Sequence, residues 1–536
     1  MYQETKSNTL LAKFKFRTDD DFVPQLYHTQ VLTDENLPEY LAQEIRFWNA
    51  RNPIFIEAPT GSGKSTFVLD KLLPAAIEEN KNILILSNRT ALSTQQKMLL
   101  LKKINSPFLK LYTEDGIAST EKFDHVGIVT YQGLINFLNN KNNQEWISDV
   151  IYAVADEAHF FAADSLFNEK CYLSLKKFVS TFKNSIRIYQ TATPWEVLVP
   201  ISEEEATLHD FERRFDGFLP PREIIRYVFK GNFGYVQLSF FDSFEQIIEK
   251  IEESVPQKWL IFVDSKKVGT DLAKQIGTNA CFIDASSKGT TEWKEIIKNS
   301  KFSTQVLITT SVFDCGINIW DDTLTNMVVC VDNRTSLIQM LGRKRRKHDE
   351  RLNLYVQRLD SRKINCRTMD YLRLTELCNK YNEGKENREK LTITVWNSDD
   401  SRLRKLFYIK HGKLKINRIC ELVIKKRYFM YRSLSQGEIS FEEMVCGWLG
   451  LSHKEKKQKR ERLICFCNIH LGYNLNEDEI AIVRKLIIDA CEEAGLKEPQ
   501  AKRIDILKQD ALNNRLEKIQ LKYKFARDSW KIEIKE

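Results

Sequence analysis

The sequence predicts an α/β protein in which two parallel β-sheets follow one another along the chain and a mostly helical, basic region comes last. Three observations support this fold class. Two series of short apolar runs alternate with stretches of helical periodicity, 536 residues are enough for about three domains, and the net charge changes sign along the chain. With 42% hydrophobic and 29% charged residues, the composition is typical of a globular protein and excludes disorder as the main state.

The first series of apolar runs predicts the first sheet. Runs of four to six apolar residues separated by helical segments are typical of parallel strands joined by crossover helices. The runs are PIFIEA, ILILSN, VGIVTY, VIYAVADE and IRIYQTA. We expect them to form the sheet of a first domain at residues 36–215, preceded by an irregular or strand-rich segment at residues 1–35.

The second series predicts a second sheet, in a domain at residues 216–360. Its runs are KWLIFVDS, ACFIDA, QVLITTS and MVVCVDN. The stretch from Trp195 to Arg226 is acidic and then carries the pair Pro220-Pro221. Because proline cannot continue a helix or a central strand, we expect this stretch to connect the two domains.

The last third of the chain, residues 361–536, is predicted to be a mostly helical accessory domain. Strand-like runs become rare here, and amphipathic stretches rich in Lys and Arg take their place. Helix breaks are expected near Gly384, residues 397–400, Gly437 and residues 447–450.

The charge of this last region sets it apart. Residues 361–536 hold 38 Lys and Arg against 26 Asp and Glu, a net charge of +12, whereas residues 1–360 hold 43 against 47, a net charge of −4. Such asymmetry indicates a polyanionic partner, either nucleic acid or an anionic membrane. Residues 402–432 hold 11 Lys and Arg, a single acid and interleaved aromatic residues. We interpret them as a nucleic-acid contact; the alternative is a helix with a core-facing aromatic stripe and a solvated basic face.

The cysteines and the apolar runs indicate a cytoplasmic protein. Eleven cysteines in 536 residues are too few for a disulfide scaffold. The first residues lack the apolar core of a signal peptide, and no run approaches 18 apolar residues. Cys465, Cys467 and His470 could suggest a metal site, but their spacing matches no common zinc pattern. We predict that the segment LICFCNIHL is a buried apolar helix or strand.

The strongest local pattern is APTGSGKS at residues 58–65, between the apolar run PIFIE and the amphipathic stretch TFVLDKLL. A phosphate-binding loop needs glycines so that backbone N–H groups can face a phosphate, a lysine for the terminal phosphates and a hydroxyl for Mg²⁺. The general pattern begins with Gly where this chain has Ala58, but the strand–loop–helix context is present. The residues predicted to bind the nucleotide are Pro59, Thr60, Gly61, Ser62, Gly63, Lys64, Ser65 and Thr66, with Ser65 as a metal ligand.

The second pattern is DEAH at residues 156–159, which ends the apolar run VIYAVA about 90 residues after the loop. A carboxylate at the end of a strand that neighbours a phosphate loop can hold Mg²⁺, and an adjacent carboxylate can polarise the attacking water. We assign the first role to Asp156 and the second to Glu157. A DExH string alone is common by chance, but this position favours triphosphate hydrolysis.

With these motifs, the chain resembles superfamily 2 helicases of the DExH/DEAH type, whose motifs it carries in the family's order over about residues 57–346. Further matches are SNRTAL at 87–92, TYQ at 130–132, TATP at 191–194, the end of LIFVDS, TTSVFDCGIN at 309–318 and QMLGRKRR at 339–346. The resemblance implies two RecA-like domains, with ATP and Mg²⁺ bound between them. It covers slightly more than half of the chain and says nothing about the last third.

The QMLGRKRR motif supplies the expected catalytic arginines. An arginine that reaches a transferring phosphate can raise the rate by about 10³–10⁵. By resemblance, Arg343 and Arg346 reach the γ-phosphate and Gln339 orients water, with the two arginines on one face at the start of a helix. The chain departs from the family at Met340, where Arg is usual, and at Arg345, where Gly is frequent. In isolation the run would suggest a solvated basic stretch or a nuclear-import signal.

The resemblance also implies contacts with a nucleic-acid track and a relay between the two sites. Six residues are expected along the track: Arg89, Thr90, Thr130, Gln132, Thr309 and Thr310. Asp314 and Gly316 match a motif that links ATP to the nucleic-acid backbone. His159, Thr191 and Thr193 are expected to couple the ATP site to the track.

Together these patterns predict an ATP-dependent helicase or translocase that moves along DNA or RNA and unwinds it. DNA is slightly favoured because no RNA-binding module is recognised. The basic last third would add grip or bind a protein partner, and no membrane partner is expected. Two alternatives stay open: a translocase that strips proteins without separating strands, and a nucleic-acid-binding sensor or assembly subunit switched by ATP. An intact Glu157 and two arginines favour hydrolysis over a switch.

Overall fold

The computed structural model describes most of the chain, and the structural statements below concern these residues alone: 27–32, 36–87, 97–98, 100–102, 113–163, 171–213, 223–254, 256–287, 290–310, 318–346, 350–451, 459–493, 507–519, 521–526 and 529–534. The chain divides into two compact units. Unit 1 comprises Met1–Gln357 and Leu377–Ile424, and unit 2 comprises Arg358–Glu376 and Lys425–Glu536. Each unit is described by itself.

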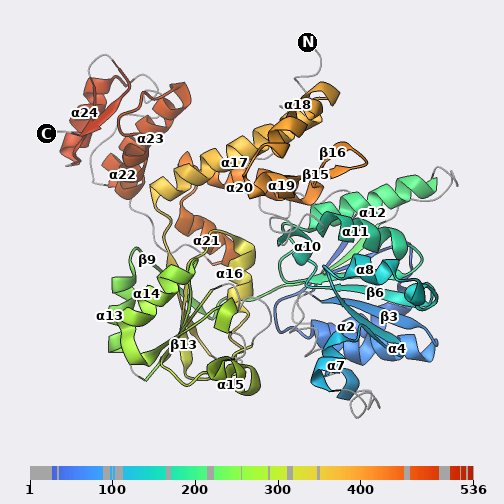
Figure 1. Cartoon of the computed structure of the whole chain (residues 1–536). Helices are drawn as coiled ribbons and strands as arrows, with labels where there is room; N and C mark the ends of the chain where they lie inside the picture. The colour runs from blue at the N-terminus through green and yellow to red at the C-terminus, as the bar shows by residue number, and fades with distance from the viewer. Residues whose placement is uncertain are drawn as a thin grey trace. The chain divides into compact units, whose positions relative to one another are not determined.

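The first sheet of unit 1 has eight strands in the order β1-β8-β2-β7-β6-β3-β5-β4 (Figure 1). Every pairing is parallel except that of β4 with β5. The strands are β1 (Tyr27–Leu32), β2 (Ile54–Glu57), β3 (Asn82–Ser87), β4 (Lys122–Phe123), β5 (Val126–Thr130), β6 (Val150–Asp156), β7 (Ile186–Thr191) and β8 (Ile224–Phe229). The five apolar runs predicted as strands form β2, β3, β5, β6 and β7, so this part of the prediction is confirmed.

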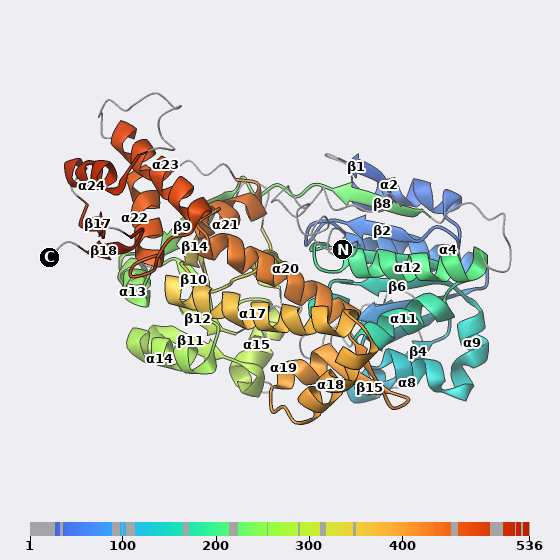
Figure 2. The same cartoon turned by 90° about the horizontal axis from the view of Figure 1, so that it is seen from above.

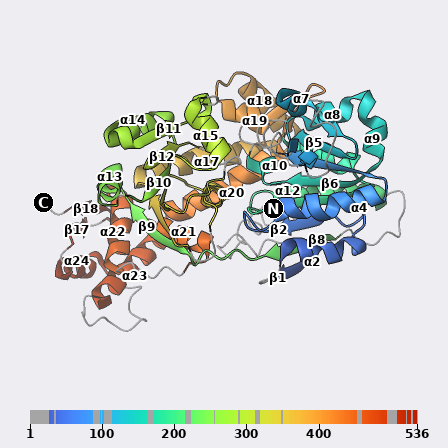
Figure 3. The same cartoon turned by 90° about the horizontal axis from the view of Figure 1, so that it is seen from below.

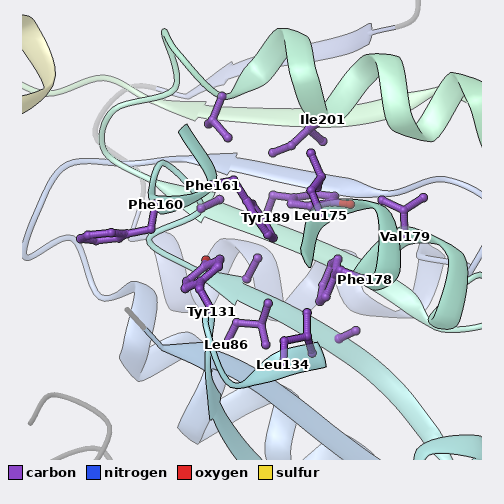
Figure 4. Packing of buried hydrophobic residues seen from close by; sticks show 14 of the residues in the cluster. Leu86, Tyr131, Leu134, Phe160, Phe161, Leu175, Phe178, Val179, Tyr189 and Ile201 are labelled. Atoms are coloured by element: carbon purple, nitrogen blue, oxygen red, sulfur yellow. The ribbon is translucent and has the colours of Figure 1, made fainter. Parts of the chain in front are cut away.

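Helices and two hydrophobic clusters cover this sheet. The helices are α2 (Leu37–Glu44), α3 (Lys64–Phe67), α4 (Leu73–Glu78), α7 (Glu114–Ser119), α8 (Leu134–Asn139), α9 (Gln144–Ser148), α10 (Phe160–Ala163), α11 (Cys171–Thr181) and α12 (Leu198–Arg213), with a π-helical turn, η3 (Val68–Leu72). Successive strand residues face opposite sides. Phe55 and Leu84 therefore join one cluster and Ile54 and Ile83 the other. Figure 4 shows part of the first cluster, in which the ring of Phe178 of α11 packs against Tyr189 of β7 and that of Phe161 of α10 against Tyr131.

The second sheet of unit 1 has six parallel strands in the order β11-β12-β10-β13-β14-β9 (Figure 1). The strands are β9 (Val236–Phe241), β10 (Lys258–Phe262), β11 (Ala280–Ile283), β12 (Val306–Thr309), β13 (Leu324–Val329) and β14 (Leu352–Gln357). The helices are α13 (Phe244–Glu253), α14 (Lys266–Ile276), α15 (Thr291–Asn299) and α16 (Arg334–Leu341). The four predicted runs form β10, β11, β12 and β13, which confirms the second parallel sheet.

The ends of the first sheet differ from the expected boundaries. Strand β8 lies beyond residue 216 but pairs with β2, so the first sheet continues into the region expected to begin the second domain (Figure 3). Strand β1 pairs with β8 from within the segment expected to be irregular or strand-rich. The stretch expected to connect the domains contains α12 and the start of β8. Polar residues interrupt both strands, His28 in β1 and Arg226 in β8. Neither strand therefore has the continuous apolar run by which the other parallel strands were predicted.

The last third of the chain is mostly helical, as predicted, and it contains two β-hairpins that were not predicted. Its helices are α17 (Ser361–Asn382), α18 (Lys385–Trp396), α19 (Ser401–Leu406), α20 (Arg418–Ser435), α21 (Phe441–Leu449), α22 (Lys459–Ile469), α23 (Glu477–Glu493) and α24 (Gln509–Lys518). The hairpins are β15 (Phe407–Lys410) with β16 (Lys413–Ile416), and β17 (Tyr523–Phe525) with β18 (Ile532–Ile534). Helices end near Gly384, residues 397–400, Gly437 and Gly450, where breaks were expected.

The residues of this last third belong to two different compact units. Residues 377–424 belong to unit 1, where Ile419 and Val423 of α20 pack into the first sheet's core. Helices α17 and α20 run side by side (Figure 2), and Asn382 Nδ2 donates to Glu421 Oε1 at 3.0 Å within unit 1. The expectation of a separate accessory domain from residue 361 therefore differs from the observed packing, because α20 contributes apolar residues to the first domain.

Unit 2 contains the remaining helices and its own hydrophobic cluster. Within it, the rings of Tyr371 and Tyr431 stack with centroids 5.7 Å apart. Residues 463–469 of the segment LICFCNIHL lie in α22, so of the two predicted alternatives, helix or strand, the helix is observed: Cys467 is in the core, although Cys465 is exposed. Within the described ranges, no three metal-binding side chains cluster. The helices described there are also too short or too polar to cross a bilayer.

Candidate active site

The phosphate loop joins β2 to α3 in the conformation that its glycines allow. Gly61 has a φ of +86° and Gly63 a φ of +92°, a left-handed backbone that side chains disfavour. Lys64 begins α3, and its side chain turns back over the loop. Its Nζ donates hydrogen bonds of 2.9 Å to the carbonyl oxygens of Ala58 and Pro59. The loop therefore fixes the ammonium group at its centre.

Lys64 is buried among charged groups. Burial is the largest cause that lowers the pKa of its ammonium group below the ordinary value. The carboxylates of Glu157 and Asp156 oppose this effect, while Arg345 and Arg343 add to it. These five side chains thus act on one another electrostatically, and they come from the loop, the end of β6 and the segment after α16.

Asp156 and Glu157 lie where β6 ends, as the sequence predicts. Asp156 is aligned with Gln190 of β7 in the parallel ladder, and its carbonyl accepts a hydrogen bond of 2.8 Å from Tyr131 Oη. Glu157 follows with a φ of +55°. A left-handed backbone is uncommon for a residue other than Gly, and such strain is concentrated at functional sites.

Glu157 remains ionised far below neutral pH. Burial alone would raise the pKa of its carboxyl group, but the Lys64 ammonium, the hydrogen bond with His159 and the Arg343 guanidinium outweigh this and lower the pKa to about 2. The distance from His159 Nδ1 to Glu157 Oε2 is 3.3 Å. A carboxylate that stays charged can accept a hydrogen bond from water at any physiological pH.

The three residues expected to couple the sites form a connected chain of hydrogen bonds. His159 Nδ1 lies 3.1 Å from Thr191 Oγ1, which accepts a bond of 3.0 Å from the backbone N–H of Thr193. The carbonyl of Thr191 accepts a bond of 3.0 Å from the N–H of Ala58. Thr191 therefore contacts both the phosphate loop and the histidine that lies 3.3 Å from Glu157.

Gln339 and Arg343 form a buried pair. Arg343 Nε donates to the Gln339 carbonyl at 3.1 Å, and Nη2 donates to Gln339 Oε1 at 2.9 Å. Among the residues that the structure describes, buried Gln339 Nε2 has no hydrogen-bond partner. Helix α16 ends at Leu341. The expectation that Arg343 and Arg346 start a helix was therefore wrong; they follow one, and Gly342, which packs against Thr60, lies at its end.

The two other arginines of the motif face different surroundings. The Arg346 guanidinium stacks on the ring of Tyr235 at 3.5 Å, and its Nη1 donates to the Glu350 carbonyl at 2.7 Å. Arg345 instead lies at the phosphate loop: a Cβ built on Gly61 would be 2.6 Å from Arg345 Nη1. The resemblance implied that Arg346 reaches the phosphates; the contacts place Arg345 beside the phosphate loop and Arg346 against Tyr235.

The remaining predicted residues are placed less completely. Four of them lie outside the described residues: Arg89, Thr90, Asp314 and Gly316. Thr130 ends β5, where its Oγ1 accepts a bond of 3.0 Å from the Gly133 N–H, and Gln132 is exposed in the turn that follows. Thr309 ends β12 and is buried, with its Oγ1 donating to the Thr310 carbonyl at 3.2 Å.

Two contacts near the site were not predicted. Arg226 of β8 forms an ion pair with Glu57, the residue that precedes the phosphate loop. The guanidinium of Arg334, at the start of α16, lies 3.6 Å from the ring of Trp195, which directly follows the TATP motif. Each pair joins residues more than a hundred positions apart, so no local pattern could reveal it. The contact of Tyr235 with Arg346 also joins residues more than a hundred positions apart, so no local pattern in the sequence indicates it.

Two family models match the chain in sequence order. The type III restriction enzyme res subunit model matches residues 1–196, and the helicase conserved C-terminal domain model matches residues 242–348. The chain is 26% identical to putative helicase 22 of Sulfolobus islandicus filamentous virus (isolate Iceland/Hveragerdi), over 61% of this chain and 64% of that protein. It is 23% identical to an uncharacterized ATP-dependent helicase of Methanocaldococcus jannaschii, over 59% and 49%. The chain thus spans less than two thirds of either relative.

Solved structures of helicases match the chain at low sequence identity. Escherichia coli DEAH/RHA helicase HrpB is 14% identical over 90% of this chain and 60% of that chain, with a TM-score of 0.41. Saccharomyces cerevisiae Dbp5 bound to RNA and ADP BeF3 is 16% identical over 59% and 81%, with a TM-score of 0.40. The two family models span most strands of the two sheets, together with the phosphate loop, the DEAH residues and the arginine motif, and over these residues the chain is similar to helicases of superfamily 2.

Proposed function

We propose that the protein hydrolyses ATP in order to move along a nucleic-acid strand, and that it separates strands as it moves. One observation carries the proposal: Lys64, Glu157 and Arg343 come from three distant segments and act on one another at a single site. A cation for the phosphates, a carboxylate for water and a guanidinium for developing charge are the groups that phosphoryl transfer requires.

The charge and the polar atoms of the loop suit a triphosphate. Lys64, Arg343 and Arg345 outnumber the carboxylates of Asp156 and Glu157. Thr60 Oγ1 and Ser62 Oγ are buried and have no hydrogen-bond partner in the part of the chain that the structure describes. Buried hydroxyls without partners cost free energy, which phosphate oxygens would offset.

The same site fits Mg²⁺. Ser65 and Asp156 would hold it, because a hydroxyl and a carboxylate offer the oxygen ligands that this ion prefers. When bound, Mg²⁺ neutralises charge on the phosphate oxygens. Asp156 ends β6 near the Lys64 ammonium, whose pKa it raises, so a carboxylate is present beside the loop.

The chain's own residues divide the chemistry. Glu157, kept ionised by Lys64, accepts a hydrogen bond from the attacking water and orients it. Arg343, fixed by Gln339, stabilises the charge that develops on the phosphate, and the contacts favour Arg345 over Arg346 as the second cation.

The track contacts follow from the strand ends. Thr130 ends β5 and Gln132 follows it, at the same edge of the sheet as Asp156 of β6, since parallel strands end together. The hydrogen bond from Tyr131 Oη, which lies between Thr130 and Gln132, to the Asp156 carbonyl supports a physical connection between track and ATP. The bonds from Thr191 to His159 and to the phosphate loop continue this connection within the ATP site. We propose nucleic acid as the partner, with DNA slightly favoured over RNA.

Lys64→Ala tests this proposal. ATP hydrolysis should fall by about 10²-fold or more, because the alanine leaves the terminal phosphates without the loop cation. Lys71→Ala is the matched control, since Lys71 lies on the following turn and pairs with Glu39 at 3.0 Å. Hydrolysis should be measured with single- and double-stranded DNA and RNA. Full activity in the Lys64→Ala protein would refute the proposed site.

A further inference from the structure

The hairpin formed by β15 and β16 has a tight, well-defined turn. Lys410 and Lys413 are directly opposite, so only two residues connect the strands. His411 has a φ of +50° and Gly412 a φ of +68°. Two consecutive left-handed residues form the type of turn that matches the natural twist of a hairpin. The end of the hairpin is therefore locally ordered.

The two faces of the hairpin differ sharply. The pairs Phe407–Ile416 and Ile409–Leu414 alternate with polar pairs along the ladder, so the apolar residues share one face. Phe407 and Leu414 are buried. Tyr381 of α17 covers them: its ring lies 5.7 Å from that of Phe407, and its Oη donates to the Leu414 carbonyl at 3.3 Å.

The other face carries three exposed lysines, Lys410, Lys413 and Lys415, which we call the hairpin face. No acid of the described residues forms an ion pair with any of them. Lys410 lies directly opposite Lys413, and like charges in that position destabilise a hairpin. An external anion would offset this repulsion.

Nearby basic residues of the same segment are paired instead. Arg418 donates to both carboxylate oxygens of Glu203 at 3.0 and 2.9 Å and to Glu421 at 2.8 Å. Arg402 is similarly paired with Asp400 at 3.0 Å. The basic segment predicted from sequence therefore has a paired, structural part and an unpaired part at the hairpin.

The hairpin is attached to the domain that carries the phosphate loop. Arg418 begins α20, its partner Glu203 lies on α12, and Ile419 joins the first sheet's core. The N–H of Asn417 donates to the Leu406 carbonyl at 2.7 Å, which closes the base of the hairpin. Any strand held by the hairpin would thus be held by the motor domain itself.

We propose that the hairpin face binds several phosphates of one strand of the nucleic-acid track. Lys413 and Lys415 lie two residues apart on one strand, a separation of about 7 Å, which is close to two steps of about 3.4 Å along one nucleic-acid strand. A linear polyanion satisfies all three lysines together, whereas a single small anion does not. This inference rests on the proposed function and adds to it a specific grip outside the helicase motifs.

Replacing the hairpin face tests the proposal in the full chain. The triple variant Lys410→Ala, Lys413→Ala, Lys415→Ala is compared with the control Lys81→Ala, Lys385→Ala, Lys390→Ala. The control lysines have carboxylates at 2.7, 3.9 and 2.7 Å, so both variants remove three charges. A third variant, with arginine at the three hairpin positions, keeps the charge.

The readout is the affinity for single- and double-stranded oligonucleotides across a salt series. Loss of three phosphate contacts should reduce the slope of log K against log salt by about 2.1 for a single strand and by about 2.7 for a duplex, so the wild-type affinity should fall about 20- to 40-fold more between 50 and 200 mM salt than that of the hairpin variant. The control and arginine variants should keep the wild-type slope. The hairpin variant should melt at the wild-type temperature or above it, because a like-charge pair is removed.

Several outcomes would overturn the inference. An unchanged slope in the hairpin variant would refute it, as would an equal loss in the control. A lower melting temperature together with a lost slope would assign the lysines to folding. Loss of binding to phosphatidylserine vesicles with nucleic-acid affinity retained would assign the face to a membrane. A wild-type protein that binds no nucleic acid at any salt would instead refute the proposed function.

Discussion

The cations of the active site and those of the hairpin face use positive charge in opposite ways. Lys64 and Arg343 are buried, and each is held by acceptors of the chain: loop carbonyls for the lysine and Gln339 for the arginine. Lys410 and Lys413 are exposed and face each other. Buried charges are positioned with precision and are little affected by salt, whereas exposed charges offer attraction that salt screens. Substitutions of the buried cations should therefore change the rate of hydrolysis, whereas substitutions of the exposed lysines should change how nucleic-acid affinity depends on salt.

The largest effect should separate the arginines of the buried group. We expect Arg343→Ala to lower the kcat of ATP hydrolysis about 10³-fold or more and Arg345→Ala to lower it more than Arg346→Ala does. Arg346→Ala should mainly remove the stacking on Tyr235, at a cost of about 0.5–1 kcal/mol in the free energy of unfolding. Steady-state kinetics and thermal denaturation of the three variants measure both effects. A larger kinetic loss for Arg346 than for Arg345 would restore the role implied by the family resemblance.

A smaller effect should appear in the pH dependence of stability. The pKa of Glu157 is about 2 in the folded protein against an ordinary 4.5. Because the folded pKa is lowered, the carboxylate stabilises the protein fully above pH 4.5, and this contribution is lost as the pH falls towards 2. The stability difference between wild type and Glu157→Gln should therefore shrink below about pH 4.5. The exposed Glu145→Gln serves as control, and a constant difference over the range would contradict the buried electrostatic network.

The smallest effect should come from a paired cation near the hairpin. Arg418→Ala removes the two hydrogen bonds to Glu203 and the one to Glu421, and we expect a loss of about 1 kcal/mol or more in the free energy of unfolding. The salt slope of nucleic-acid binding should stay at the wild-type value, because Arg418 is already neutralised. A double-mutant cycle with Glu203→Ala isolates the pair. A reduced slope in the Arg418→Ala protein would contradict the claim that only the unpaired cations bind nucleic acid.

The parallel strands were predictable because each can be recognised from its own residues. A strand such as β6, buried on both faces, must be a continuous apolar run, and polar loops mark its ends. Strand β8 escaped because Arg226 interrupts its apolar run, and the hairpin of β15 and β16 escaped because its alternating lysines also suit an amphipathic helix. Membership in a sheet depends on partners distant in sequence, which explains why β8 was assigned to the wrong domain.

The candidate site was predictable to the level of its motifs. The phosphate loop, the carboxylates after β6 and the His159–Thr191 contact lie together, as the motif order implies. The spacing of the arginine motif could not show which side chain reaches the loop. That choice depends on where α16 ends and on Tyr235, a residue more than a hundred positions upstream that holds Arg346.

The most direct test of the central claim is the rate of ATP hydrolysis by wild type and Glu157→Gln, with and without a nucleic-acid strand at low salt. We predict that the strand stimulates the wild type, and that Glu157→Gln still binds ATP but hydrolyses it about 10²–10⁴-fold more slowly, because the water loses its carboxylate. Equal hydrolysis by the two proteins, or a wild-type rate that no nucleic acid changes, would contradict a nucleic-acid-driven ATPase at this site.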